Sequence, residues 1–149
     1  MREQISDSYK TAFKAGDKRR TGTLRAVIAA IKDKDIEARG LGKEPLAEAD
    51  VLTLLQKMVK QREESLGIYE TAGRDDLAVV EREEIAILSE FLPKGLSDAE
   101  VDAAIKAAIE KTGAAGGKDM GKVIASLKAD YPGRIDFGKA SGKVKAALG

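Results

Sequence analysis

Three prolines divide the sequence into segments whose apolar residues recur at the spacing of an α-helix. Pro45, Pro93 and Pro132 each lie between two such segments, where a residue without a backbone N–H does least harm. Signals for β-strands are weak, because β-branched and aromatic residues do not alternate with polar ones over a useful length and aromatic residues make up only 4% of the chain. The pattern therefore predicts an all-α protein.

The sequence up to Pro93 predicts an N-terminal four-helix domain over residues 1–93. Gly16 and Asp17 mark the end of a first short helix and the cap of a second, and residues 40–42 end the second. Each predicted helix has one apolar face built on spacings of three and four residues. The predicted core residues are Ile5, Tyr9, Ala12 and Phe13; Leu24, Val27, Ile28 and Ile31; Val51, Leu54, Leu55, Met58, Leu66 and Tyr69; and Leu77, Ile85, Ile87, Leu88, Phe91 and Leu92.

The remaining sequence predicts a small C-terminal three-helix domain over residues 96–149. Ser97 and Glu100 have the spacing of a capping box, in which each side chain accepts a hydrogen bond from the other residue's N–H. The glycine-rich residues 113–117 end the first helix, and Asp136 is a suitable N-cap for the last. The predicted core residues are Val101, Ile105, Ala108 and Ile109; Met120, Val123, Ile124 and Leu127; and Phe137, Ala140, Val144 and Leu148.

The composition excludes several kinds of chemistry. The chain has no Cys and no His, which removes disulfides, thiolate nucleophiles, imidazole bases and zinc sites built on Cys or His. We expect no catalytic residue, no metal and no cofactor. The N-terminal residues carry charges of both signs and no uncharged stretch reaches 18 residues, so neither a signal peptide nor a membrane span is expected. These features predict a cytoplasmic protein without a membrane partner.

Basic residues gather toward the C-terminus, although the whole chain has a net charge of only +1. Residues 118–149 carry seven basic and three acidic side chains. Lys118 and Lys122 are four apart in one predicted helix, and Lys139 and Lys143 are four apart in the next, which gives two short basic ridges. The alternative is that these lysines are ordinary solvated helix faces. The candidate nucleic-acid-binding residues are Lys118, Lys122, Arg134, Lys139 and Lys143.

Aromatic residues are scarce in this basic region. Only Tyr131 and Phe137 are nearby, and Phe137 belongs to the predicted core. Stacking on single-stranded bases is therefore not favoured. Recognition of RNA shape through phosphates fits the residue types better.

A second basic cluster lies nearer the N-terminus. It consists of Lys14, Lys18, Arg19, Arg20 and Arg25 and is interrupted by the run Thr21-Gly22-Thr23, whose backbone N–H groups could receive an anion near a helix start. The alternative is a turn at Asp17 and a helix irregularity at Gly22. We favour the turn and the helix irregularity over an anion site.

Carboxylates cluster between the third and fourth predicted helices. Glu63–Glu64, Asp75–Asp76, Glu81 and Glu83–Glu84 could supply an acid/base pair or a Mg²⁺ site. Arginines are close to them in sequence at positions 62, 74 and 82, which favours solvated ion pairs instead. Elsewhere, Gly121 falls inside an apolar stripe, which indicates close helix packing or the approach of the backbone to a ligand, and we favour packing.

Five ordered blocks of sequence resemble the GatB/YqeY family, and together they extend over nearly the whole chain. The blocks are residues 24–25, 57–65, 72–78, 90–94 and 118–123. The resemblance implies a four-helix N-terminal domain and a three-helix C-terminal domain, in agreement with the periodicity. Residues 120–124 and 133–136 match the family's tail motif.

The family takes its name from similarity to the C-terminal end of the GatB subunit of tRNA-dependent amidotransferase, which amidates Glu-tRNA or Asp-tRNA with glutamine. The tail domain of that enzyme is implicated in holding the tRNA. The resemblance thus implies an accessory tRNA-binding module, with tRNA or an aminoacylation or amidotransferase complex as partner. The alternative is a helical protein–protein interaction module without nucleic-acid binding.

The resemblance does not extend to catalysis, nor to every tail position. The kinase-like and amidase parts of the amidotransferase are absent, so the carbon–nitrogen ligase activity would belong to a relative's complex. Gly138 and Gly142 stand where better helix formers are expected, and each costs about 1 kcal/mol relative to Ala inside a helix. They predict a last helix that is frayed or starts late.

Overall fold

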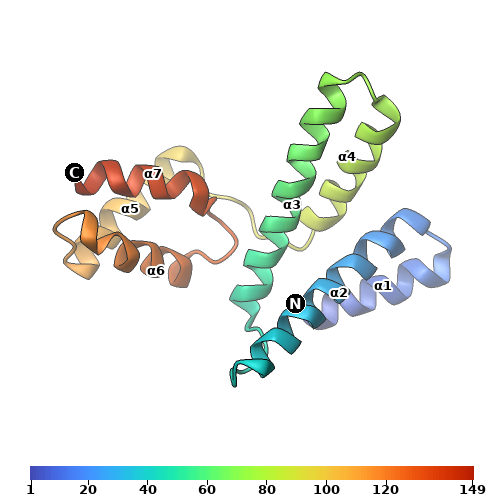
Figure 1. Ribbon diagram of the computed structural model, residues 1–149, viewed down its shortest axis with the longest axis horizontal. Coiled ribbons are helices and arrows are strands. Elements are labelled where there is room, and N and C mark those ends of the chain that lie inside the picture. Colours follow the sequence, from blue (N-terminus) through green and yellow to red (C-terminus); the bar gives the residue numbers. More distant parts are fainter. The chain divides into compact units, whose positions relative to one another are not determined.

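A computed structural model describes residues 1–149 and contains helices and connecting turns but no strand. The prediction of an all-α protein is confirmed. The chain divides into two units, Met1–Leu92 and Pro93–Gly149, each with its own hydrophobic core (Figure 1). No helix is long and apolar enough to cross a membrane.

Unit 1, Met1–Leu92, consists of two helical hairpins (Figure 1). The first pairs α1 (Arg2–Ala15) with α2 (Lys18–Gly40), and the second pairs α3 (Glu48–Thr71) with α4 (Asp75–Ser89). The apolar faces meet in one core, whose buried residues are Ile5, Leu24, Val27, Ile31, Val51, Leu55, Met58 and Leu88.

The turn between α1 and α2 follows from two adjacent residues. Gly16 adopts a left-handed conformation with φ of 74°, which glycine reaches without strain. The Asp17 side chain then accepts a hydrogen bond from the Arg20 N–H at 3.1 Å and caps α2. The predicted helix end and cap are confirmed.

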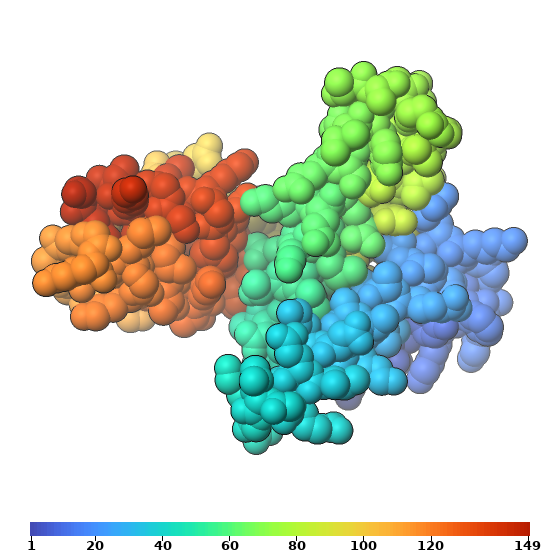
Figure 2. All heavy atoms as spheres, viewed as in Figure 1, coloured from blue at the N-terminus to red at the C-terminus, as the bar shows by residue number.

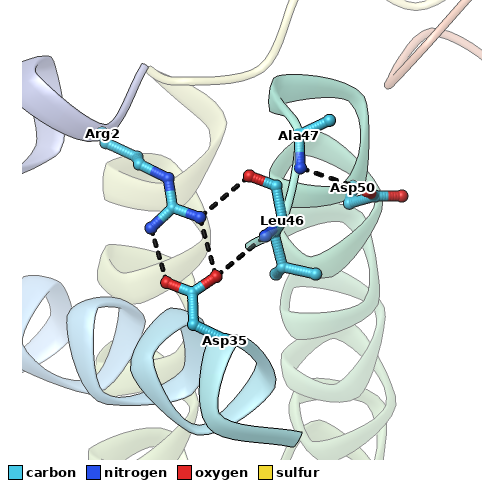
Figure 3. Close-up of polar contacts among 5 residues, drawn as sticks. All are labelled: Arg2, Asp35, Leu46, Ala47 and Asp50. Carbon is cyan, nitrogen blue, oxygen red and sulfur yellow. Dashed lines mark hydrogen bonds and ion pairs between the residues drawn. The ribbon is translucent and has the colours of Figure 1, made fainter. Parts of the chain in front are cut away.

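A polar clamp joins the start of α1, the far end of α2 and the loop before α3 (Figure 3). The Arg2 guanidinium donates two hydrogen bonds to the Asp35 carboxylate, at 2.7 and 2.8 Å, and a third to the Leu46 carbonyl at 2.9 Å. Asp35 also accepts from the Leu46 N–H at 2.9 Å. The Arg2 hydrogen bond, followed by the one from Leu46, lowers the pKa of Asp35 to about 2.

Not every predicted core residue of unit 1 is buried. Phe13 lies at the edge of the apolar face of α1, and 62% of it is exposed. The α3–α4 tip stands clear of the α1–α2 hairpin in the space-filling view (Figure 2), and two apolar residues near this tip that are not among the predicted core residues, Ile68 and Val79, are 67% and 45% exposed. The sequence pattern identifies a helical face but not how far the neighbouring hairpin covers it.

Unit 2, Pro93–Gly149, packs three helices and a short 3₁₀ turn around a second core (Figure 1). The elements are α5 (Asp98–Thr112), η1 (Gly117–Asp119), α6 (Met120–Asp130) and α7 (Phe137–Leu148). Its buried residues are Val101, Ala104, Ile105, Ala108, Val123, Leu127, Ile135, Ala140 and Val144.

The capping box at the start of α5 is confirmed. The Glu100 N–H donates to Ser97 Oγ at 3.2 Å, and the Ser97 N–H donates to Glu100 Oε1 at 3.1 Å. The predicted close packing at Gly121 is wrong, because a Cβ at this position would have no neighbour within 4 Å.

The prediction that the last helix starts late is wrong. Helix α7 begins at Phe137 and includes both Gly138 and Gly142. Asp136 caps it by accepting hydrogen bonds from the N–H groups of residues 138 and 139, at 3.0 and 3.3 Å. Ala140 and Val144 are buried in the core of unit 2. Capping and burial together outweigh the low helix propensity of the two glycines.

Candidate nucleic-acid interface

The five candidate nucleic-acid-binding residues lie on three different elements of unit 2. Lys118 belongs to the 3₁₀ turn η1, Lys122 to α6, Arg134 to the connection before α7, and Lys139 and Lys143 to α7. The ridge predicted for Lys118 and Lys122 on one helix is therefore wrong, because α6 begins only at Met120. Lys139 and Lys143 do share a helix, as predicted.

Two of the five side chains are held by contacts within unit 2. The Lys143 Nζ lies 3.1 Å from Asp102 Oδ1 and 3.9 Å from Asp98 Oδ1. The Arg134 Nε donates to the Lys94 carbonyl at 3.0 Å, and the Arg134 carbonyl accepts from the Leu96 N–H at 2.9 Å. These contacts fix α7 and the residue 134 segment, so Lys143 and Arg134 are less available to a ligand than the sequence suggested.

The other three candidates are exposed. Lys122 lies 3.7 Å from Asp119 with 69% of its side chain exposed, so this pair is weak. Lys118 and Lys139 have no carboxylate within ion-pairing distance. The same is true of four further lysines of unit 2, at positions 94, 106, 128 and 145. Unit 2 therefore presents a set of lysines whose charge no internal ion pair neutralises.

Some carboxylates of unit 2 accept backbone hydrogen bonds in turns or at helix starts, whereas Asp98, Asp102 and Asp130 pair with lysines. Asp119 accepts from the Ala115 N–H at 3.0 Å, and this hydrogen bond lowers its pKa. The Ser97 backbone N–H likewise lowers the pKa of Glu100, and Asp136 caps α7. The acidic groups thus support the fold while most lysines remain in water.

The basic cluster of unit 1 does not form an anion-binding loop. The run Thr21–Thr23 lies inside α2, and the Thr21 N–H donates to the Asp17 carbonyl at 3.0 Å, as the helix requires. The Arg19 Nε lies 2.9 Å from Glu83, and Arg20 pairs with Glu90 and with Ser8. The hypothesis of a phosphate site at these backbone groups is therefore wrong.

Arginines pair with carboxylates of α3 and α4 as predicted, and the pairs of Arg74 and Arg82 are solvated, but the pair of Arg62 is not. Arg62 donates to Glu84 at 2.7 Å in a pair whose side chains are only 18% and 22% exposed. Arg74 contacts Asp76 at 3.1 Å and Arg82 contacts Glu70 at 3.7 Å. No group of three or more acidic side chains is arranged to hold a metal ion.

Glu81 differs from these paired carboxylates. It lies on the buried side of α4, and its Oε2 atom is shielded from water without a hydrogen-bond partner. Burial, followed by the negative charge of Glu84, raises the pKa of Glu81. The sequence placed Glu81 among exposed acids because it stands in a run of charged residues. Such a run does not show which of its members faces inward.

Comparison with known proteins identifies the family. A model of the Yqey-like protein family matches residues 2–148. The chain belongs to this family. The resemblance seen in the sequence blocks is thus confirmed at the level of the Yqey-like family, and the match includes both units.

Similar proteins occur in fungi. "Altered inheritance of mitochondria protein 41, mitochondrial" of Lachancea thermotolerans is 34% identical over 103 residues, which are 68% of this chain and 54% of that protein. The proteins of the same name from Kluyveromyces lactis and Pyrenophora tritici-repentis are each 27% identical, over 96% and 98% of this chain and 73% and 80% of theirs. The chain spans about half the length of the Lachancea protein.

The names of these relatives contradict one expectation from the sequence. We expected a cytoplasmic protein, whereas the relatives are named as mitochondrial. The expectation rested on the charge pattern of the N-terminal residues, and such a pattern does not determine the compartment. The prediction of a cytoplasmic location is therefore wrong.

Proposed function

We propose that the chain is an accessory RNA-binding protein whose unit 2 contacts the phosphate backbone of structured RNA, with tRNA as the RNA. The observation that carries this proposal is the set of exposed lysines without a carboxylate partner, Lys118 and Lys139 above all. Residues 93–149 carry ten basic and seven acidic side chains. A polyanion would supply the missing counter-charges.

Contacts to phosphates fit this surface better than contacts to bases. Lysine is a point charge on a flexible stem, which suits a phosphate oxygen but reads no base sequence. The aromatic residues of unit 2, Tyr131 and Phe137, pack against the core and are only partly exposed. Unit 2 therefore has no free aromatic ring on which an unpaired base could stack.

The choice of tRNA rests on the resemblance to the tail of the GatB subunit. We propose by the same resemblance that the chain acts beside a glutamine-dependent tRNA amidotransferase or another aminoacylation complex. The chemistry of amide transfer would then belong to the partner. Purified alone, the chain should neither hydrolyse glutamine nor amidate Glu-tRNA, and turnover that survives repurification would contradict this part of the proposal.

The test is tRNA binding by the intact chain at several salt concentrations. Each lost phosphate contact should reduce the slope of log affinity against log salt by roughly 0.7–0.9. The variant Lys118→Glu/Lys139→Glu should bind more weakly with a flatter slope. The matched control, Lys57→Glu/Lys60→Glu, makes the same charge change at exposed positions of α3 and should bind nearly as the native chain does.

Two outcomes would contradict the proposal. One is the absence of tRNA binding at low salt, and the other is equal loss of affinity in the test and control variants. Helicity measured by circular dichroism should be unchanged in both variants, since all four lysines are exposed.

A second candidate function is supported by the α3–α4 tip of unit 1. Ile68 and Val79 are exposed there to an extent that is unusual for large apolar side chains, which favours a protein-interaction module. In that case a protein should be retained by the intact chain after nuclease treatment, and Ile68→Ser/Val79→Ser should release it.

A further inference from the structure

Two aromatic rings of α1 lie next to each other, Tyr9 against the core of unit 1 and Phe13 in solvent. The rings of Tyr9 and Phe13 are stacked, with centroids 6.3 Å apart and planes inclined by 29°. Phe13 is nevertheless 62% exposed, so Tyr9 covers only part of the phenylalanine ring. The rest of the ring is open to a further flat group.

Arg25 of α2 holds this pair in place. Its guanidinium carbon lies 5.8 Å from the centroid of the Tyr9 ring, within the range of a cation–π contact. Its Nη2 also donates to the Tyr9 hydroxyl at 3.3 Å. The position of Tyr9, and through it that of Phe13, is thus set by a residue of the neighbouring helix rather than by α1 alone.

Several cations of the α1–α2 hairpin, including Arg25 beside Tyr9, have no carboxylate partner, unlike others on the same hairpin. Arg19 and Arg20 are paired with Glu83 and Glu90 of the α4 region. By contrast, no carboxylate lies within 4 Å of the charged groups of Lys10, Lys14, Lys18 and Arg25. Lys10 precedes Phe13 by three residues and so lies on the same side of α1.

We infer that this surface, defined by Tyr9, Phe13 and Arg25 with Lys10 and Lys14 of α1, binds an unpaired segment of RNA. An exposed aromatic ring amid unpaired cations is the combination that proteins use for single-stranded nucleic acid, because the ring stacks on a base and the cations contact the phosphates. An acidic peptide would satisfy the cations but would leave the open ring without a matching flat group.

This site is separate from the one proposed on unit 2, which has lysines but no free ring. The choice of RNA over DNA rests on the proposed function. The inference of a base-stacking surface rests on the exposed ring and the cations alone. The two proposals can therefore fail independently: the variants of Lys118 and Lys139 test structured RNA on unit 2, and variants of Phe13 test unpaired bases on unit 1.

The direct test uses Phe13→Trp in the intact chain. The native sequence has no Trp, so the introduced indole is the only one and reports on its own surroundings. An oligouridylate of about 10 nucleotides, within the site size of known single-strand binders, should quench its fluorescence. An oligomer of abasic sugar-phosphate of the same length should bind more weakly and should not quench.

The affinity test compares the native chain with Phe13→Ala. Loss of one stacked base should weaken oligouridylate binding about 5-fold to 100-fold, whereas Phe13→Trp should retain it. Ile68→Ala is the matched control, because it removes a similarly exposed apolar side chain at the far tip of the α3–α4 hairpin. Its affinity should equal that of the native chain.

Three results would overturn the inference. The first is equal binding of abasic and normal oligomers, which would show attraction to phosphate without stacking. The second is quenching of the introduced indole by polyglutamate but not by oligouridylate, which would assign the surface to an acidic protein. The third is binding of oligothymidylate DNA without binding of RNA.

Discussion

The two units of this protein differ in the cations that they carry. Unit 1 has eight arginines, and six of them form ion pairs, most of which join different helices, such as Arg62 with Glu84 and Arg19 with Glu83. Unit 2 has one arginine and nine lysines, and most of these lysines have no carboxylate partner. Arginine suits the first task because its planar fork binds carboxylates in a fixed geometry, whereas lysine remains solvated and available.

This difference indicates where a polyanion can bind. A cation already paired with a carboxylate of the fold must give up that partner before it contacts a polyanion, whereas an unpaired cation loses nothing. Unit 2 as a whole is therefore the better polyanion surface. Unit 1 also has unpaired lysines, such as Lys32, Lys57 and Lys60, and its hairpin surface around Phe13 and Arg25 combines unpaired cations with an exposed aromatic ring.

The largest expected effect tests whether the two cores are independent. Leu88 is fully buried in unit 1, and Leu88→Ala should lower the free energy of unfolding of that unit by about 2–5 kcal/mol through lost burial and a residual cavity. Hydrogen exchange resolved by mass spectrometry should show faster exchange within residues 1–92 and unchanged protection within 93–149. Equal loss of protection in both would show that the units unfold together and would break the comparison.

The next effect concerns ion pairs that hold helices together. Glu84→Ala leaves the Arg62 guanidinium, 18% exposed, without its carboxylate, and should cost about 1–3 kcal/mol in chemical denaturation. The unit 2 counterpart is Asp102→Ala, which frees Lys143 from a more exposed pair and should cost less than about 1 kcal/mol. Similar costs for the two would remove the distinction between structural and solvated charges.

The third prediction concerns the helix cap at the start of α7 in unit 2. Asp136→Ala removes the acceptor for two N–H groups at the start of α7 and should destabilise unit 2 by about 1 kcal/mol. Exchange of the amides of residues 138 and 139 should accelerate first. Asp130→Ala, which removes only an exposed partner of Lys111, is the control and should leave these two amides unchanged.

A pH effect is expected from the clamp in unit 1. Because the pKa of Asp35 is about 2 in the fold and about 3.9 in an unfolded chain, the clamp contributes its full stability above about pH 4. That contribution is lost as the pH falls toward 2. Asp35→Asn should therefore flatten the decline in melting temperature between pH 4 and pH 2, whereas the exposed neighbour Asp33→Asn should leave it unchanged.

The smallest expected effect is a gain in stability, in contrast to the losses predicted above. Burial raises the pKa of Glu81, so its charged form is disfavoured in the fold and its cost grows as the pH rises through that pKa. Glu81→Gln should slightly raise the melting temperature at pH 7, and the gain should vanish below about pH 4, where the native side chain is also neutral. Glu63→Gln, at an exposed position of α3, should show no such gain.

Much of the helical structure could be predicted because the interactions that define it are local. The spacing of Ser97 and Glu100, the pair Gly16 and Asp17, and the position of Asp136 all act within three residues, and each is found as predicted. The prediction was wrong where tertiary packing outweighed local preference. The glycines of α7 are the example, since buried Ala140 and Val144 hold the helix that they weaken.

The candidate site was less predictable than the fold. Both Lys118 and Lys143 appeared as members of basic ridges, but Lys118 lies on a 3₁₀ turn and Lys143 pairs with Asp102. Nothing in the local sequence indicates that Asp102, 41 residues away, is the partner. The aromatic surface at Phe13 was likewise missed, because its spacing from Ile5 and Tyr9 matches that of a core residue.

Helix positions, helix ends and apolar faces follow from the sequence, because periodicity and capping act over a few residues. Which charges are neutralised and which rings remain exposed depends on tertiary packing. Arg19 and Arg20 meet carboxylates 64 and 70 residues away, and Phe13 stays open because the hairpins meet elsewhere. Both outcomes depend on which helix faces pack together, and that is a property of the whole unit rather than of any segment.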